Sequence, residues 1–397
     1  MANDLNNNVV FSPSSTQKML RNGNPFDKIA SVQYLDQLAM NKTISEQYIT
    51  AARTGSYVAG TGAAESAVTT ATDQYTIDQA FSSAFSEDEI IEGAQDQNWA
   101  DRVSEDAGYQ LARKTAQWGF AKLISQAPHS LAISGRLTGN ILRDALQEAN
   151  ERVKDAEAGQ FNGLLYAVYS PNALNYIIED YVQNNQNEFN DMALREGVNG
   201  FIGKKYQGRF CFETNEYQHS LPISFGGSLS DGDIIYLNGG TLTVTFKTTL
   251  TGAANEVLIG ANATASMTNL RAFINGTSGA GSTYGDMSAW DRAQMQNAGL
   301  SLGSGATSAT LVKYGRIRAT KSGTNITLGT ESYSMVVGSR EGLIMTGDLT
   351  PKYEKLQTAT STGYASHAKT HLFTSRWGGK VPHNAGRSVV VLTGIQY

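Results

Sequence analysis

The stretch TIDQAFSSAFSEDEIIEGAQDQNWADRVSEDAGYQLARKTAQWGFAKLI, residues 76–124, decides the fold of this chain. Within it, Ser86 is followed by three acidic residues, which is a favourable start for a helix. Apolar residues then recur at helical spacing as far as Ile124. We therefore expect one long helix over residues 86–124, with a break at Gly108 as the open alternative. The stretch is also strongly acidic, because only Arg102 offsets the Asp and Glu residues between Asp73 and Asp106.

The residues before this stretch indicate an extended arm and a hairpin. Residues 1–50 open Asn-rich and hold apolar residues at loose spacing, which predicts an arm with one short helix. Residues 53–72, RTGSYVAGTGAAESAVTTAT, consist mostly of Gly, Ala, Ser and Thr, and the glycines of AGTGAAES favour a turn. Arms of ten to twelve residues would reach about 35–40 Å. A hairpin of this kind is not stable alone and needs a partner surface.

The residues after it alternate between helices and strands. An amphipathic helix is expected over residues 138–156, lying along a sheet. LLYAVYS, residues 164–170, predicts a short apolar strand, and Pro171 then begins a helix through Val182. GRSVVVLTGI, residues 386–395, predicts a buried terminal strand. Together these elements favour an α+β fold.

Residues 226–330 differ in composition from the rest of the chain, because charge falls while Gly, Thr, Asn and Ser rise. The segment DIIYLNGGTLTVTFKTT, residues 233–249, predicts a hairpin with its turn at NGG. A short helix is expected over residues 266–275 and a second hairpin over residues 315–331. We interpret this region as a compact β-rich module inserted into the chain.

Composition narrows the class of protein. The 397 residues contain 40 Gly, and charged residues make up only 17%, against about 25% in ordinary globular proteins. Hydrophobic residues at 40% exclude a disordered chain, and the net charge of −5 argues against a surface built throughout to neutralise phosphates. No apolar run reaches the length of a membrane span, and the N-terminus lacks a signal-peptide pattern. A weakly charged surface is expected where copies of one chain cover each other.

No motif indicates an active site. His367 and His371 stand four residues apart in HAKTH, but Ala368 occupies the place of the general base that a zinc protease needs, so a polar or interfacial pair is favoured. Cys211, the only cysteine, lies between Phe210 and Phe212 and indicates a buried structural thiol. We therefore expect no enzyme, no catalytic or metal-binding residue, and no cofactor.

The order of these elements resembles the major capsid protein of tailed bacteriophages with the HK97-like fold. Residues 76–124 are similar to the strand that leaves the E-loop and to the spine helix. LLYAVYSPNALNYIIED, residues 164–180, is similar to the strand and helix of the axial domain, and SYSMVVGSREGLIMTGDLTP, residues 332–351, to that domain's later strand. The resemblance covers residues 25–225 and 332–397.

The resemblance implies an α+β, HK97-like capsid fold with an inserted β-rich domain. The domains that it implies are an N-terminal arm (1–50), the E-loop hairpin (51–76), a peripheral domain with long helices (77–160), the first part of the axial domain (161–225), the inserted domain (226–331) and the completion of the axial and peripheral domains (332–397). The type member of the family is cross-linked through an E-loop lysine. No lysine lies between Thr43 and Arg113 in this chain, so no such bond is expected.

The implied function is self-assembly, through hexamers and pentamers, into an icosahedral shell that encloses phage double-stranded DNA. Implied partners are other copies of the chain, a portal protein, scaffolding and decoration proteins, and packaged DNA through non-specific contacts; no membrane is implied. The implied location is the virion capsid, assembled in the host cytoplasm. The acidic front and the basic end of the chain, residues 351–397, would offer complementary faces between copies. The expected assembly contacts are Arg53, Tyr57, Glu65, Glu87, Asp88, Glu89, Glu92, Arg376, Lys380 and Arg387.

The alternative from another class is a phage tail or surface-adhesion protein that uses residues 226–331 to bind a host or a carbohydrate. A fibre would show repeats and few long helices, whereas this chain shows the reverse. An enzyme is a third alternative, but it would need a convergent polar site that the sequence does not display.

Overall fold

A computed structural model of the protein describes residues 26–32, 43–51, 69–88, 97–133, 135–155, 165–176, 201–206, 209–347, 352–359, 365–383 and 388–396. Its helices include α2 (Phe26–Ile29), α4 (Gln97–Gln126), α5 (Gly139–Asp155), α8 (Ala263–Asn275) and α9 (Ala289–Asn297), with the 3-10 turns η5 (Asn238–Gly240) and η6 (Arg340–Gly342). Residues 171–176 are also helical. The strands of the first half are β1 (Ser31–Val32), β2 (Thr43–Ala51), β3 (Thr69–Thr76), β4 (Gln79–Asp88), β5 (His129–Ala132), β6 (Leu165–Tyr169), β7 (Phe201–Tyr206), β8 (Arg209–Glu213) and β9 (Gln218–Phe225). The later strands are β10 (Ile234–Leu237), β11 (Leu242–Lys247), β12 (Glu256–Leu258), β13 (Ser301–Leu302), β14 (Ser308–Tyr314), β15 (Thr320–Ser322), β16 (Ile326–Leu328), β17 (Ser332–Ser339), β18 (Ile344–Gly347), β19 (Lys352–Ala359), β20 (Ala365–Lys380) and β21 (Val390–Gln396).

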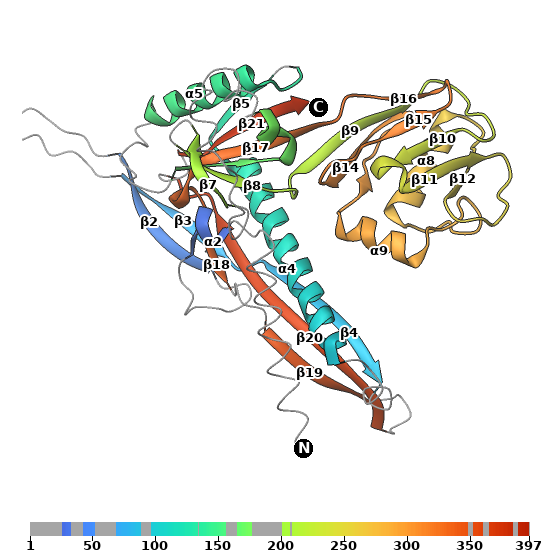
Figure 1. The fold of residues 1–397 in the computed structure, drawn as a ribbon, viewed down its shortest axis with the longest axis horizontal. Coiled ribbons are helices and arrows are strands. Elements are labelled where there is room, and N and C mark those ends of the chain that lie inside the picture. Colours follow the sequence, from blue (N-terminus) through green and yellow to red (C-terminus); the bar gives the residue numbers. More distant parts are fainter. Residues whose placement is uncertain are drawn as a thin grey trace, which may run out of the picture.

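The protein is an elongated body with a rounded module on one side (Figure 1). The main core of the body gathers residues from Phe26 to Ile395, whereas a separate core in the module is formed entirely by residues between Leu221 and Ile326. Helices and mixed sheets alternate through the body, which confirms the α+β class. Within the described residues no helix is long and apolar enough to cross a membrane.

A ten-stranded sheet connects the body to the module. Its central strand, β17, pairs with β6 and β21 in the body and, at its first residues, with β9, which continues into the module beside β14. Helix α5 packs on β21 and β5, and its stripe of Leu142, Leu146, Ala149 and Val153 is buried. The expected helix over residues 138–156 is thus confirmed, as is the buried terminal strand.

The long axis of the body is formed by α4 and the sheet beneath it. Thirty residues at 1.5 Å each make α4 about 45 Å long. It runs along β4 and β20, which pair antiparallel from Gln79 opposite Trp377 to Asp88 opposite Ala368. Trp377 is fully buried with the Phe81 ring 5.2 Å away, and Phe373 packs against α4. Helix α4 therefore covers one face of this sheet.

The expected start of the long helix at Ser86 is wrong. Residues 86–88 are the last residues of β4, and α4 is described only from Gln97. Side chains from Asp73 to Ala84 alternate in exposure with a period of two, which suits a strand with one buried face. The capping signal is local, and the long-range pairing with β20 overrides it. No break occurs at Gly108, which is buried within the continuous helix.

Two expectations for the second half of the chain also change. Residues 352–359 and 365–380, for which the sequence indicates no element, form the antiparallel pair β19–β20, so His367 and His371 lie in a strand. In the module, the first hairpin is confirmed as β10–β11. The second is wrong, because β15 pairs with β10 whereas β16 pairs with β9. Polar or short strands of this kind are decided by distant partners rather than by their own pattern.

A glycine in α4 makes room for the N-terminal arm. Phe26 and Ile29 of α2 are fully buried, and the Phe26 ring lies 4.9 Å from that of Phe120. A Cβ atom at Gly119 would come within 2.4 Å of the Phe26 ring. Glycine is unfavourable inside a helix by about 1 kcal/mol relative to alanine. Its place here is explained by the close approach of the arm.

We predict that Gly119→Ala lowers the free energy of unfolding, although alanine is the better helix former, because the Phe26 ring must leave its pocket. Amide exchange of residues 26–32 should become faster. The substitution Phe26→Ala alone should cost about 3–5 kcal/mol. Adding Gly119→Ala to it should then cost little, since the clash is gone. A Gly119→Ala variant that is more stable, with unchanged exchange in the arm, would contradict this explanation.

Candidate assembly surface

The hairpin β2–β3 is a two-stranded sheet of its own, paired from Thr43 opposite Thr76 to Ala51 opposite Thr69. In Figure 1 it lies at the left side of the body. Most of its described side chains are exposed, namely Thr43, Ser45, Glu46, Gln47, Thr70, Thr72 and Gln74. A two-stranded hairpin is marginal by itself in water. This ribbon is therefore a surface that gains stability when something else covers it.

The position of this hairpin differs from the one expected. Its first strand, β2, begins at Thr43, within residues assigned to the arm, and residues 52–68 lie outside the described part of the chain. The Gly-rich pattern predicts the turn but not the residue at which the first strand begins. The strand TISEQYITA alternates only weakly in polarity, and even its apolar residues Ile44 and Tyr48 are only half-buried.

A buried carboxylate fastens the base of the hairpin to the body. Asp73 of β3 is only 5% exposed. Its Oδ1 accepts a hydrogen bond from Lys380 Nζ at 2.5 Å, and its Oδ2 accepts one from the backbone N–H of His383 at 2.8 Å. On β2, the Tyr48 ring stacks on His383 with 4.8 Å between the centroids. Both strands are thus held by the residues at and just after the end of β20.

The predicted contact residues fall into two groups. Lys380 is bound to Asp73 of its own chain, Arg376 is half-buried in β20 opposite Ala80, and Glu87 and Asp88 lie in β4 with their backbones paired to β20. The others lie outside the described residues: Arg53, Tyr57, Glu65, Glu89, Glu92 and Arg387. The acidic front and the basic end therefore meet within one copy, at the Asp73–Lys380 ion pair and along the β4–β20 pairing. Because Lys380 already pairs with Asp73 of its own chain, it does not supply the charge complementarity that was expected between copies.

A polar joint that the sequence did not reveal fixes the module to α4. Glu216, just before β9, accepts from Arg113 Nε at 2.8 Å and from Gln117 Nε2 at 2.7 Å. Lys114 Nζ donates to the carbonyl of Asn297 at the end of α9. Burial and the nearby Arg113 lower the pKa of Lys114. Arg113 and Gln117 stand four residues apart on one helix face, but their partner is about a hundred residues away, so spacing alone could not identify it.

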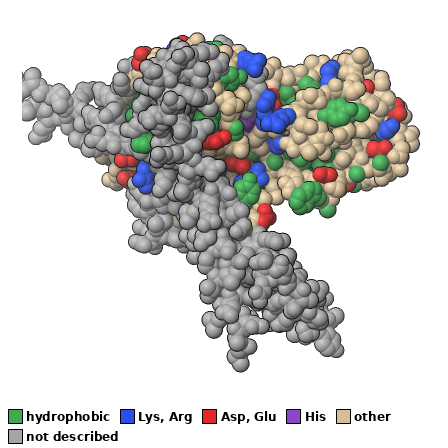
Figure 2. Space-filling view, in the orientation of Figure 1, with side chains coloured by type: hydrophobic (Ala, Val, Ile, Leu, Met, Phe, Trp, Pro, Cys, Tyr) green, Lys and Arg blue, Asp and Glu red, His purple; other side chains and the backbone are tan. Residues whose placement is uncertain are grey.

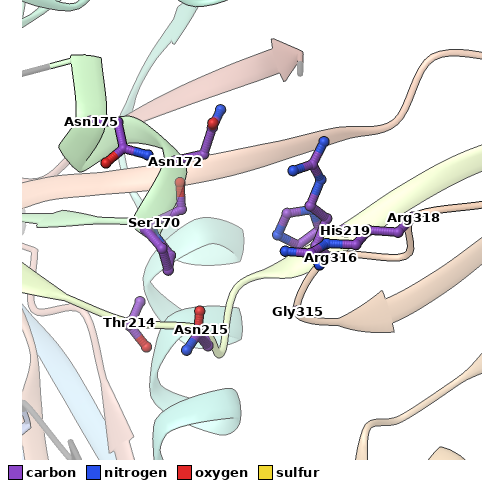
Figure 3. Close-up of a pocket in the computed structure, with 10 residues that line it drawn as sticks. Ser170, Asn172, Asn175, Thr214, Asn215, His219, Gly315, Arg316 and Arg318 are labelled. Carbon is purple, nitrogen blue, oxygen red and sulfur yellow. The ribbon is translucent and has the colours of Figure 1, made fainter. Parts of the chain in front are cut away.

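A cavity of about 170 Å³ opens at this joint (Figure 3). Its walls come from the residues around Pro171, from the turn before β9, and from the loop after β14. The lining residues are Ser170, Pro171, Asn172, Asn175, Thr214, Asn215, His219, Gly315, Arg316 and Arg318. Ser170 Oγ is hydrogen-bonded to the Tyr333 hydroxyl at 2.7 Å. Within the described residues, no group of His, Cys, Asp and Glu is arranged to hold a metal ion.

Glu331 organises one wall of this cavity. Its carboxylate accepts from the backbone N–H groups of Ile317 and Arg318, at 2.7 and 3.1 Å, and lies 2.9 Å from His219 Nδ1. Burial tends to raise the pKa of Glu331, but these three partners together outweigh it, so the pKa lies below its usual value. The ionised carboxylate of Glu331 therefore holds the loop after β14, which carries Arg316 and Arg318.

We predict that Asp73→Ala speeds amide exchange throughout β2 and β3 while the module is unaffected, because Lys380 and the His383 N–H lose their acceptor. The loss should be about 1–3 kcal/mol of local stability. Asp78→Ala is the matched control, since its contact with Lys122 is long, at 3.6 Å, and exposed. Equal effects of the two substitutions would show that Asp73 does not fasten the hairpin.

We also predict that Glu331→Gln destabilises the protein at neutral pH. Because the pKa of Glu331 is lower in the folded than in the unfolded protein, its charge adds stability above the unfolded value, and this contribution is lost as the pH falls through the folded value. Denaturant unfolding at several pH values should show the difference between wild type and variant shrinking as the pH falls below about 4. A difference that is independent of pH would contradict the role of the charge.

Comparison with known proteins gives structural similarities only. No family model and no curated protein matches the chain. A solved structure of Mycobacterium phage Che8 is similar over 92% of this chain and 90% of its own, with 13% identity and a TM-score of 0.49. The capsid structure of cyanophage P-SCSP1u is similar over 94% and 88%, with 12% identity and a TM-score of 0.47. The mature capsid of bacteriophage PhiM1 is similar over 93% and 86%, with 13% identity and a TM-score of 0.45.

Proposed function

We propose that this chain is a major capsid protein with an HK97-like fold, which assembles with copies of itself into an icosahedral shell around phage double-stranded DNA. The observation that carries the proposal is the β2–β3 hairpin. It is a ribbon fastened to the body through a buried carboxylate at its base, while most of its other described side chains face solvent. A chain that builds such a ribbon needs a second surface to cover it.

The shape of the body supports assembly rather than an independent globular role. Helix α4 and the β4–β20–β19 sheet form the long part of the body, and α2 packs against the C-terminal part of the same helix. The hairpin leaves the long part of the body on one side. The surface that covers the hairpin must therefore be a different surface of the next copy. Contacts between unlike surfaces are heterologous, and they produce rings when the rotation closes. Hexamers and pentamers of a shell are rings of this type.

The domain assignment is part of the same proposal. The N-terminal arm holds α2, the E-loop corresponds to β2–β3, and the peripheral domain contains α4. The axial domain combines β6, β8, β17 and β21 from residues 161–225 and 332–397. Residues 226–331 form the inserted domain. The module has a core of its own, to which β9 also contributes Leu221, Ile223 and Phe225. The finer partners remain part of the proposal as well: a portal protein, scaffolding and decoration proteins, and non-specific contact with packaged DNA in virions assembled in the host cytoplasm.

Electron microscopy and sedimentation of the full chain, expressed with its neighbouring genes, test this proposal. We expect closed shells built from hexamers and pentamers. Fibres would favour the tail or adhesion alternative, and monodisperse monomers would reject assembly altogether. Either result would overturn the proposal.

A pair of variants tests the role of the hairpin itself. Ser45→Lys with Gln47→Lys places two charges at exposed positions of β2, so the fold should persist while shells are lost because the charges enter a covered contact. Thr320→Lys with Ser322→Lys is the matched control, since these are exposed positions with the same spacing on the short strand β15. Shell yields by sedimentation and melting temperatures by circular dichroism separate assembly from folding. Equal shell yields for the hairpin variant and wild type would contradict the role of the hairpin.

A further inference from the structure

Lys313 is a buried lysine of the module that has no acidic partner. Figure 2 shows other Lys and Arg side chains at the surface of the module, where water solvates them. Lys313, in β14, is instead only 7% exposed. Its Nζ donates to two neutral acceptors, Oδ1 of Asn238 at 2.7 Å and the backbone carbonyl of Arg316 at 2.9 Å, and it forms no ion pair with any described residue. Lysines are almost never buried without an acid to pair with, so this position needs an explanation.

The surroundings favour the uncharged form of the Lys313 amine. Burial is the main cause that lowers its pKa. The charges of Arg113 and Arg318 act in the same direction, whereas those of Glu331 and Glu216 act against it, and the pKa remains below its usual value. An uncharged lysine amine is a nucleophile, and removal from water is one way in which proteins activate it.

The side-chain amide of Asn238 is held beside this amine. Asn238 begins η5, directly after β10, with φ of +54°, a conformation that asparagine tolerates better than most residues. Its backbone N–H donates to the Ile317 carbonyl at 2.8 Å, and its own carbonyl accepts from Thr241 Oγ1 at 2.7 Å. The hydrogen bond from Nζ to Oδ1 brings the amine next to Cγ, one bond away from that oxygen. Groups held together in this way react as if they were highly concentrated.

We propose that Lys313 and Asn238 join through an isopeptide bond inside the module. The electron pair of the uncharged Nζ attacks Cγ of Asn238, so that an Nζ–Cγ bond forms and the Cγ–Nδ2 bond breaks. One proton passes from Nζ to Nδ2, which leaves as ammonia, and Oδ1 remains the carbonyl oxygen of the new amide. The step consumes no oxidant, reductant or other reactant. The negative charge of Glu331 favours the positive charge that develops on Nζ during the attack.

The bond explains why a lysine occupies this buried position. It replaces an amine that would be costly to bury as a cation with a neutral amide. The new amide keeps one N–H, which can still donate to the Arg316 carbonyl. The bond also connects the turn after β10, in the four-stranded sheet of the module, to β14, in the ten-stranded sheet. A covalent link between distant residues stabilises a fold, largely by restricting its unfolded state. The inference concerns the module alone and does not depend on assembly into shells.

Mass spectrometry of the full chain, digested after unfolding, tests the bond directly. We expect one branched peptide that joins the segment around Asn238 to the segment around Lys313. Its mass should lie about 17 Da below the sum of the two segments, which is the mass of the lost ammonia. Two separate peptides with the masses that the sequence gives would overturn the proposal.

A matched pair of variants distinguishes the isopeptide bond from a succinimide. Asn238 precedes Gly239, and ring closure between these two residues would release the same ammonia. Lys313→Arg keeps a positive charge and N–H donors but has no nucleophilic amine, so the loss of mass should disappear. Lys321→Arg, at an exposed lysine of the same module, is the control and should keep the loss of mass.

The outcomes of this comparison are decisive. A loss of mass at Asn238 that persists in Lys313→Arg would show a succinimide and overturn the proposal. The wild-type digest settles the question even where Lys313→Arg does not fold, because a succinimide joins no two segments. Where Lys313→Arg folds, its melting temperature by circular dichroism should be lower than that of Lys321→Arg, since the covalent link is gone.

Discussion

The pairing of β4 with β20 is the contact on which the rest of the body depends. It joins residues 79–88 to residues 368–377, nearly three hundred positions apart, and creates the surface along which α4 lies. Trp377 is buried where this sheet meets the helix, and at the end of the same strand Lys380 reaches Asp73. The same strand therefore supports the helix on one side and fastens the hairpin at its end.

The positions of the other elements of the body depend on this sheet. Because α4 is held along β4 and β20, its opposite surfaces are available to the arm and to the module. Gly119 admits the Phe26 ring, and Arg113 and Gln117 hold Glu216 before β9. The hairpin is fastened to the end of β20 at Asp73 and Tyr48, but most of its other described side chains are exposed. Its exposure is a consequence of the same architecture, and a neighbouring copy is the partner that satisfies it.

The sequence predicted those elements that carry their own periodicity. The helix α5, the hairpin β10–β11, the strand β6 before Pro171 and the buried strand β21 all contain a local pattern that tertiary packing preserves. The sequence does not predict three features correctly: the strand at residues 86–88, the polar strands β19 and β20, and the separate partners of β15 and β16. In each case a distant strand decides the structure, and a local capping or turn signal cannot reveal that partner. The candidate site shows the same division. The charges of Lys380 and Glu87 are visible in the sequence, but only the fold shows that Lys380 is bound to Asp73. In the same way, only the fold brings Arg316 and Arg318 to one cavity.

The central claim is that other copies of the chain cover the β2–β3 hairpin. Amide exchange of residues 43–51 and 69–76, compared between free subunits and assembled particles, measures this directly. The account predicts strong additional protection of the hairpin in particles, while the buried strands β11 and β17 keep the exchange rates of the free subunit. Hairpin exchange that is equally fast in particles and in free subunits would contradict it.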